Sequence, residues 1–257
     1  MRILTTSVAN VTELREKVVL ACRMIGSRGV SKGSFGHVSA RIPGGDNRIL
    51  IKSKGPDEEA LEFTTDRDVI TLSLDGRVLE APTGLQAPAE TAMHLAIYRA
   101  RPEIMSVIHS HPLPVVVLTA CDKPMVGIYG AFDGDAALRL LDEGLPTFQG
   151  SLTITDDALA AEFMAVMGQR RACLLRGHGM TVAGTSVEEA TATSLTLDEL
   201  AHANYMAYAI GTPQGVPDLE AHRARWADAG GRRNGGAVNA AGEPFVWRYN
   251  KKLLQRG

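Results

Sequence analysis

Residues 87–112 read APAETAMHLAIYRARPEIMSVIHSHP, and this stretch contains a helix pattern followed by a strand pattern. Proline is tolerated in the first turn of a helix, so we expect Pro88 to open a helix over residues 88–100 that stops before an Arg-Pro pair. The next segment, MSVIHSHP, predicts a strand over residues 105–112 whose alternate side chains share one face. The stretch therefore predicts a helix that leads into a strand displaying two histidines together.

The rest of the chain mixes helices with hairpins. Helices are expected over 10–29 and 114–120, over 155–168 with Thr155 as N-cap, and over 186–210 with a capping box from Ser186 to Glu189. Strands are expected over 37–42 and 47–53 around the turn Pro43-Gly44-Gly45-Asp46, over 69–80 as a hairpin centred on Asp75-Gly76, and over 172–184 as a pair. Because hairpins dominate, the sequence predicts an α/β fold with a mainly antiparallel sheet covered by helices.

Composition excludes several classes of function. The 257 residues carry a net charge of -2 and are 5% aromatic, so neither a basic surface nor stacking platforms for nucleic acid are expected. No run approaches the roughly 18 apolar residues that span a bilayer, and residues 1–10 lack a signal-peptide pattern, which predicts a cytoplasmic protein without a membrane partner. Cys22, Cys121 and Cys173 form no CxxC pair and are expected to be small buried hydrophobic residues.

Two segments are expected: a catalytic domain over 1–211 and a C-terminal extension over 212–257 that packs on this domain or on a neighbouring subunit. From residue 212 to residue 243 the chain is rich in Gly, Pro, Arg and Ala and includes the run GGRRNGG. Such a composition predicts a segment that is mobile or ordered only against another subunit.

Three histidines form a candidate metal site. His109 and His111 are two apart on a strand, so both imidazoles project from one face and can share an ion. His178 lies between two glycines, which allow a tight turn and close approach of the backbone to a ligand. An isolated HxH pair is also common in cores and on surfaces, but the Gly-His-Gly segment favours one divalent ion, zinc, manganese, iron or cobalt, with open positions for substrate oxygens.

Glu90 stands at the start of the helix that precedes this strand. In that position a carboxylate is ordinarily a solvated first-turn acid that the helix dipole stabilises. Beside a metal, it could instead ligate the resting ion and then carry a proton once substrate oxygens bind. His94, one turn further, could line the site but is expected mainly to pack the helix, and His202 and His222 are expected to be surface or contact residues.

Together, GHVSAR, residues 87–112 and LLRGHGMTVAGTSVEEA resemble the class II aldolase/adducin family over about Val11 to Ile210. The resemblance implies that His109, His111 and His178 are metal ligands and that Glu90 is the catalytic acid/base. It also implies a three-layer α/β/α sandwich and a homo-oligomer, usually a tetramer with active sites near subunit contacts. The C-terminal extension could then cover a neighbour's site and give Tyr249 or an arginine a role there.

This chain differs from the sugar-phosphate members of the family at the positions that bind the phosphate of the substrate. Their phosphate is held by a Gly-Asn pair, a Thr-Pro-Ser-Gly-like turn and two serines before the acid, where this chain has Gly36-His37, residues 52–55 (KSKG) and Pro88-Ala89. The hydroxyls that bind phosphate are absent, and proline removes a backbone donor. Cationic or titratable groups replace them: His37, Lys52, Lys54 and, nearby, Arg41.

These replacements suit a small carboxylated substrate and are similar to the decarboxylase branch of the family, which acts on 3,4-dihydroxyphthalate or a hydroxypyridine dicarboxylate. We therefore expect a metal-dependent lyase in aromatic catabolism, with Glu90 or His37 protonating the ring carbon and Lys52, Lys54 or Arg41 holding a retained carboxylate. The alternatives are an aldolase that cleaves a sugar or sugar phosphate, an iron oxygenase on the same fold and, least favoured, a non-catalytic adducin-like module.

Overall fold

One mixed sheet of eight strands forms the centre of the described chain, in the order β4-β3-β2-β1-β5-β8-β7-β6. The computed structural model describes residues 8–44, 47–128, 134–228 and 238–256. The strands are β1 (His37–Arg41), β2 (Arg48–Lys52), β3 (Val69–Ser73), β4 (Val78–Glu80), β5 (Ser106–Ser110), β6 (Thr147–Phe148), β7 (Ala172–Leu175) and β8 (Gly179–Gly184). Only β6 and β7 pair in parallel, which confirms the predicted α/β class and its mainly antiparallel sheet.

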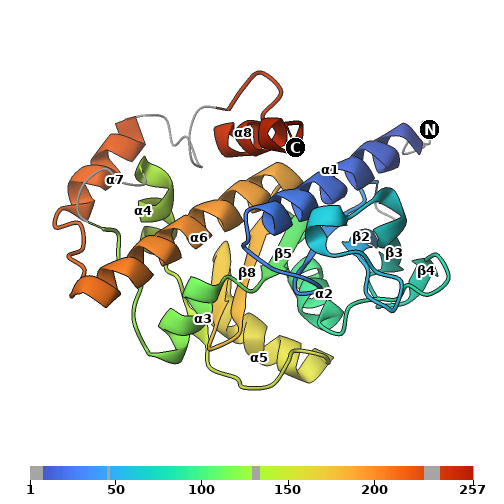
Figure 1. The fold of residues 1–257 in the computed structure, drawn as a ribbon, viewed down its shortest axis with the longest axis horizontal. Coiled ribbons are helices and arrows are strands. Elements are labelled where there is room, and N and C mark those ends of the chain that lie inside the picture. The colour runs from blue at the N-terminus through green and yellow to red at the C-terminus, as the bar shows by residue number, and fades with distance from the viewer. Residues whose placement is uncertain (1–7, 45–46, 129–133, 229–237, 257) are drawn as a thin grey trace.

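Helices contact the sheet from both sides (Figure 1). On one side lie α1 (Val8–Ser27) and α6 (Val187–Ile210), which bury a large apolar cluster with alternate residues of the central strands. On the other lie α2 (Thr91–Ala100) and α5 (Asp157–Met167), which bury a second cluster. The remaining helices are α3 (Leu113–Ala120), α4 (Gly134–Glu143), α7 (Leu219–Asp228), α8 (Phe245–Leu254) and the short 3-10 turns η1 (Leu61–Phe63) and η2 (Asp66–Asp68).

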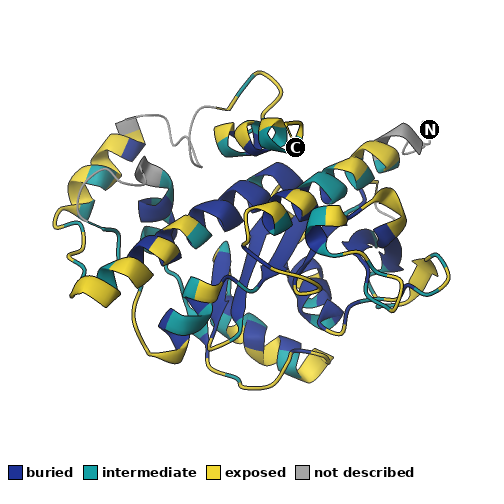
Figure 2. Ribbon diagram, in the orientation of Figure 1, coloured by how far each residue is buried: buried dark blue, intermediate teal, exposed yellow. Residues whose placement is uncertain are grey.

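The buried residues are concentrated in the central strands and in the N-terminal part of α6, from Val187 to Asn204, as Figure 2 shows. Strands β1, β5, β7 and β8 are almost continuously buried because they have helices on both faces. The same period-2 alternation that fills both apolar clusters also decides which side of the sheet each polar side chain reaches.

Three helix starts differ from the predictions. Helix α2 begins at Thr91 with Glu90 as its N-cap residue, so Pro88 precedes the helix. Helix α5 is capped by Asp156, whose carboxylate accepts from two backbone amides, and the expected cap at Thr155 was wrong. At α6 the Ser186 hydroxyl accepts from the amide of Glu189, but the carboxylate of Glu189 accepts from the amide of Thr185, so the capping box is only half formed.

The C-terminal part of the chain contains more ordered structure than its composition predicts. Helix α7 packs on α4, where Arg223 pairs with Asp142 and the Trp226 side chain is buried. Helix α8 packs on α1 and α6 and buries Trp247. Residues 219–228 and 245–254 thus form helices that contact the domain itself, while contact with another subunit stays a prediction. The GGRRNGG run, and Gly45-Asp46 of the predicted turn, lie outside the described residues.

Two further expectations can be compared with the structure. Cys22 and Cys173 are buried as predicted, whereas Cys121 is exposed because it follows the last turn of α3 at the surface. Within the described ranges, no helix is both long and apolar enough to cross a membrane.

Candidate metal centre

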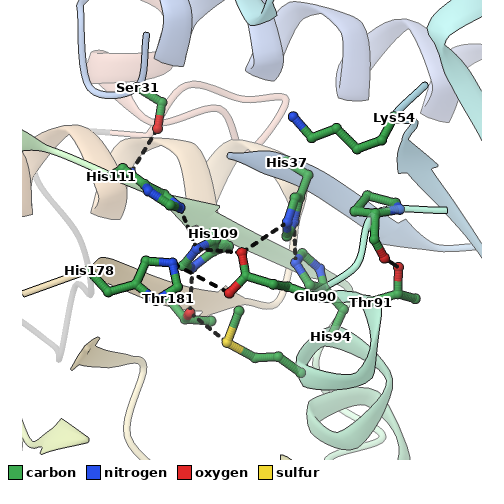
Figure 3. A network of polar contacts seen from close by, with 12 residues as sticks. Ser31, His37, Lys54, Glu90, Thr91, His94, His109, His111, His178 and Thr181 are labelled. Carbon is green, nitrogen blue, oxygen red and sulfur yellow. Dashed lines mark hydrogen bonds and ion pairs between the residues drawn. The ribbon is translucent and has the colours of Figure 1, made fainter. Parts of the chain in front are cut away.

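Strand β5 carries the first two predicted ligands. His109 and His111 lie two residues apart, and their Nε2 atoms are 2.8 Å from each other (Figure 3). The strand register places His109 between His37 on β1 and Thr181 on β8, so these side chains point to the same face of the sheet. The backbone amide of His111 donates to the Ser31 hydroxyl at 2.7 Å, which anchors the end of the strand.

A tight turn between β7 and β8 brings His178 to the same point. Gly177 adopts a positive φ of 62°, which favours glycine, and its amide donates to Thr119 Oγ1 at 3.0 Å. At Gly179 a Cβ atom would overlap the carbonyl oxygen of Ser110, so only glycine lets β8 approach β5 this closely. The two glycines noted in the sequence thus have separate roles, the first in the turn and the second in the close approach.

Glu90 faces these imidazoles from the N-terminus of α2. Its Oε2 is 3.3 Å from Nε2 of His109, and its Oε1 is 3.4 Å from Nε2 of His178. The residue is only 8% exposed, so it is not a solvated first-turn acid. One donor atom each from Glu90, His109, His111 and His178 lies within 4.8 Å of the other three. The structure therefore brings together all four residues that the sequence proposed for the metal.

The protonation states suit a divalent cation. Burial raises the pKa of Glu90, but the close contact with His109 and the nearby imidazoles of His178 and His111 outweigh it and lower the pKa to about 2. Burial, followed by the neighbouring imidazole of His109, lowers the pKa of His111 to about 3 and also lowers the pKa of His178. Neutral imidazoles and an ionised carboxylate are the forms that ligate a metal.

The hydrogen bonds around the cluster leave its donor atoms free for an ion. The Thr181 hydroxyl donates to Met93 Sδ, so its oxygen can accept from Nδ1–H of His109 at 3.1 Å. This tautomer leaves the lone pair of His109 on Nε2, directed at the cluster. Oε1 of Glu90 is buried and accepts no hydrogen bond from the described residues. The residues present thus fit a divalent ion held by three nitrogens and one oxygen.

The predicted catalytic His37 and the predicted substrate-binding residues lie at different places. His37 and Lys54 adjoin the cluster, and Nε2 of His37 is 3.9 Å from Oε2 of Glu90 (Figure 3). Burial, followed by the imidazoles of His94 and His109 and then the charge of Lys54, lowers the pKa of His37. Lys54 also pairs with Glu58 at 3.6 Å. Burial lowers the pKa of Lys54, against the effect of Glu58.

The other two predicted cations have different partners. Lys52 is buried, and its ammonium donates to the carbonyl of Ser53 at 3.1 Å, on the sheet face that packs against α1. The same ammonium lies 4.0 Å from Oε2 of Glu58, the carboxylate with which Lys54 also pairs. Arg41 lies at the far end of β1 from His37, where its guanidinium donates to the carbonyls of Tyr98 and Ile104. The structure does not bring Arg41 to the metal cluster.

Sequence reasoning did not assign a role at the site to the residues that lie on the side of His37 away from the metal cluster. His94 was expected mainly to pack the helix, but its Nε2 is 2.8 Å from Nδ1 of His37. Ser39 and Tyr98 continue this contact and were not singled out. Two signals were available: Ser39 is two residues from His37 on a strand, and His94 is four residues from Glu90 on a helix.

A buried carboxylate and three imidazoles around one point, on a mixed α/β sheet, define a candidate metal-dependent enzyme. The chain belongs to the class II aldolase and adducin family, since the family model "Class II Aldolase and Adducin N-terminal domain" matches residues 16–205. A 3,4-dihydroxyphthalate decarboxylase of Arthrobacter keyseri is 37% identical over 86% of this chain and 88% of its own length. A second, of Terrabacter sp. (strain DBF63), is 38% identical over 78% of this chain and 83% of its own.

Solved structures show the same fold. An aldolase II superfamily protein from Pseudomonas syringae superposes with a TM-score of 0.80 at 22% identity, covering 97% of this chain and 95% of that one. The L-fuculose 1-phosphate aldolase from Glaciozyma antarctica PI12 gives a TM-score of 0.75 at 18% identity, covering 100% and 93%. With its family and these relatives, the chain is an enzyme, a lyase.

Proposed function

We propose that this lyase decarboxylates a hydroxylated aromatic dicarboxylate of the 3,4-dihydroxyphthalate type, as a step in aromatic catabolism. The observation that carries the proposal is a metal-type cluster with the cationic Lys54 beside it, in place of a phosphate cradle. The names of the relatives support the same reaction, since those that share 32 to 38% identity are 3,4-dihydroxyphthalate decarboxylases.

In this proposal His109, His111, His178 and Glu90 hold one divalent ion, which supplies a Lewis acid that stabilises negative charge on the substrate's ring oxygens. Glu90 is ionised before substrate binds, because its pKa is about 2, and it accepts the proton of a substrate hydroxyl. The bond between the ring and its carboxylate breaks and carbon dioxide leaves. Glu90 then delivers this proton to the ring carbon that lost the carboxylate, and the neutral His37 beside it contributes a hydrogen bond to the substrate.

Lys54 is placed to hold the carboxylate that the product retains. Its ammonium has three donors, so it can keep Glu58 and still bind a substrate oxygen. Arg41 takes no part in this proposal, because its guanidinium binds backbone carbonyls away from the cluster. The tetramer that the family resemblance implies, with residues 212–257 as an extension near subunit contacts, belongs to the same proposal.

Replacing Lys54 by methionine is expected to raise KM for 3,4-dihydroxyphthalate by about 10- to 100-fold, because a hydrogen bond to a charged group contributes about 1.5–3 kcal/mol. The value of kcat should change much less, since Lys54 binds the group that does not react. Steady-state kinetics on the metal-replete enzyme measures both constants. Lys123, whose ammonium lies over the Tyr208 ring, provides a matched Lys→Met control that should leave KM unchanged. An unchanged KM in Lys54→Met would remove this residue from the substrate site.

Purified metal-replete enzyme is expected to release one carbon dioxide for each 3,4-dihydroxyphthalate consumed, and the activity should disappear with a chelator and return with metal. Carbon dioxide release and product chromatography measure the reaction over a panel of ortho-hydroxy aromatic acids. L-fuculose 1-phosphate and a ferrous-dependent oxygen-uptake assay serve as comparison reactions. Turnover of the sugar phosphate without turnover of any aromatic acid would replace this proposal with an aldolase, and oxygen uptake alone would replace it with an oxygenase.

A further inference from the structure

Behind His37, away from the metal cluster, lies a continuous row of buried hydrogen bonds. Nδ1 of His37 is 2.8 Å from Nε2 of His94, and Nδ1 of His94 is 2.7 Å from the hydroxyl of Ser39. The same hydroxyl is 2.8 Å from the hydroxyl of Tyr98. All four side chains are at most 2% exposed, so water does not substitute for these contacts. Figure 3 shows the first step, with His94 directly next to His37.

The row forms where one face of strand β1 packs against one face of helix α2. His37 and Ser39 are alternate residues of β1, and His94 and Tyr98 are one turn apart on α2, so the two pairs interdigitate. Arg41, the next residue on this face of β1, closes the row, since its guanidinium lies over the Tyr98 ring at 5.0 Å and binds the Tyr98 carbonyl. Glu90 begins the same face of α2. Strand β1 and helix α2 therefore connect the metal cluster to the buried contact between Arg41 and Tyr98.

The row determines which nitrogen of His37 can meet a substrate. Nδ1 is used by His94, so Nε2 alone is directed toward the cluster, where it lies 3.9 Å from Oε2 of Glu90. The negative carboxylate favours a proton on Nε2. Nδ1 of His37 must then accept from Nε2–H of His94, and Nδ1 of His94 must accept from the hydroxyl of Ser39. The Tyr98 hydroxyl completes the order by donating to Ser39, whose single hydrogen goes to His94 at 2.7 Å rather than to the more distant carbonyl of Val107 at 3.4 Å.

We propose that His94, Ser39 and Tyr98 are positioning residues that hold His37 as the Nε2–H tautomer, with that N–H directed into the metal cluster, where it donates a hydrogen bond to a substrate oxygen on which negative charge develops. The inference rests on the proposed function for the substrate oxygen that His37 meets, but the tautomer itself is a property of the resting protein. The three residues touch neither substrate nor metal, and they act through the orientation of one ring. Partners of this kind typically change activity by about 10- to 100-fold when they are removed.

The test compares His94→Leu with His94→Gln, because the glutamine amide can donate to His37 and accept from Ser39 while leucine can do neither. His94→Leu is expected to lower kcat about 100-fold with KM and bound metal unchanged, and His94→Gln to retain activity within about 10-fold of the wild type. Tyr98→Phe removes only one hydroxyl and is expected to lower kcat about 10-fold. Tyr208→Phe, which loses an exposed hydroxyl bonded to the Pro124 carbonyl, is the matched control and should match the wild type.

A spectroscopic measurement separates this proposal from the proposed function. In the zinc-loaded protein labelled with 15N-histidine, His37 is expected to show a protonated Nε2 and an unprotonated Nδ1 without any substrate. Tyr98→Phe should shift the His94 and His37 resonances, and Tyr208→Phe should not. The opposite tautomer of His37, or equal losses of kcat in His94→Gln and His94→Leu, would overturn the positioning role. Absence of carbon dioxide release by the wild type would overturn the reaction, while the nitrogen resonances still decide the tautomer.

Discussion

Replacing His109 by alanine is expected to leave a folded protein that binds no stoichiometric metal and has lost at least about 10³-fold of its lyase activity. The reason is its central place: Nε2 of His109 is 2.8 Å from Nε2 of His111 and 3.3 Å from Oε2 of Glu90. Removing it takes away one candidate ligand and the imidazole that lies next to the Glu90 carboxylate. Elemental analysis of the purified protein and an activity assay measure the two losses.

An exposed histidine provides the control for this variant. His202 lies on the exposed side of α6, so His202→Ala should keep both metal and activity. Circular dichroism establishes that His109→Ala is folded. A folded His109→Ala protein with a full equivalent of metal and wild-type turnover would show that the cluster is not the catalytic metal site.

Replacing Glu90 by glutamine is expected to lower kcat by about 10²- to 10⁴-fold, the usual contribution of a positioned acid/base. Glutamine keeps the shape of the side chain but cannot accept and return a proton. The three imidazoles remain, so the metal content should stay near one per chain, although the affinity for metal should fall. Titration of the metal-free protein and single-turnover kinetics separate binding from chemistry.

Glu220→Gln on the exposed face of α7 is the matched control and should have no effect. The informative result is the combination of bound metal with slow chemistry. If Glu90→Gln retained its metal and turned over at the wild-type rate, proton transfer would have to be assigned to another group, and His37 would be the first to test.

The sheet and the metal cluster could be predicted because each rests on a short-range pattern. The hairpin over residues 69–80 and the HxH spacing of His109 and His111 need only the period of a strand. The close approach at His178 was indicated by its flanking glycines. These features require no knowledge of distant parts of the chain, and the structure shows them where the sequence placed them.

The residues proposed to bind substrate could be predicted only in part, because the sequence does not show where the charged group of a long side chain lies. Lys52 and Lys54 are alternate residues, yet one ammonium lies against the α1 side of the sheet and the other adjoins His37. Arg41 shares a face of β1 with His37 but lies four residues along the strand, beyond the cluster. Those outcomes depend on partners that come from other elements, such as the carbonyls of Tyr98 and Ile104.

The buried row behind His37 could not be predicted for a similar reason. It depends on the pairing of one particular helix face with one particular strand face, and no local pattern specifies that pairing. The same limit explains helix α7, whose weak amphipathic pattern gave little reason to expect a helix before its contacts with α4 were known.

The candidate metal ligands lie in the turn between β7 and β8, at the C-terminal end of β5 and at the N-terminus of α2, whereas Lys54 beside them comes from a separate segment after β2. Because the two sets of side chains are carried by different parts of the backbone, substitutions in the segment after β2 can alter the acidic group that is accepted while the ion and its ligands remain intact. Under the proposed function, a protein with this fold can therefore change its substrate preference through a short loop while it keeps the same metal-dependent reaction.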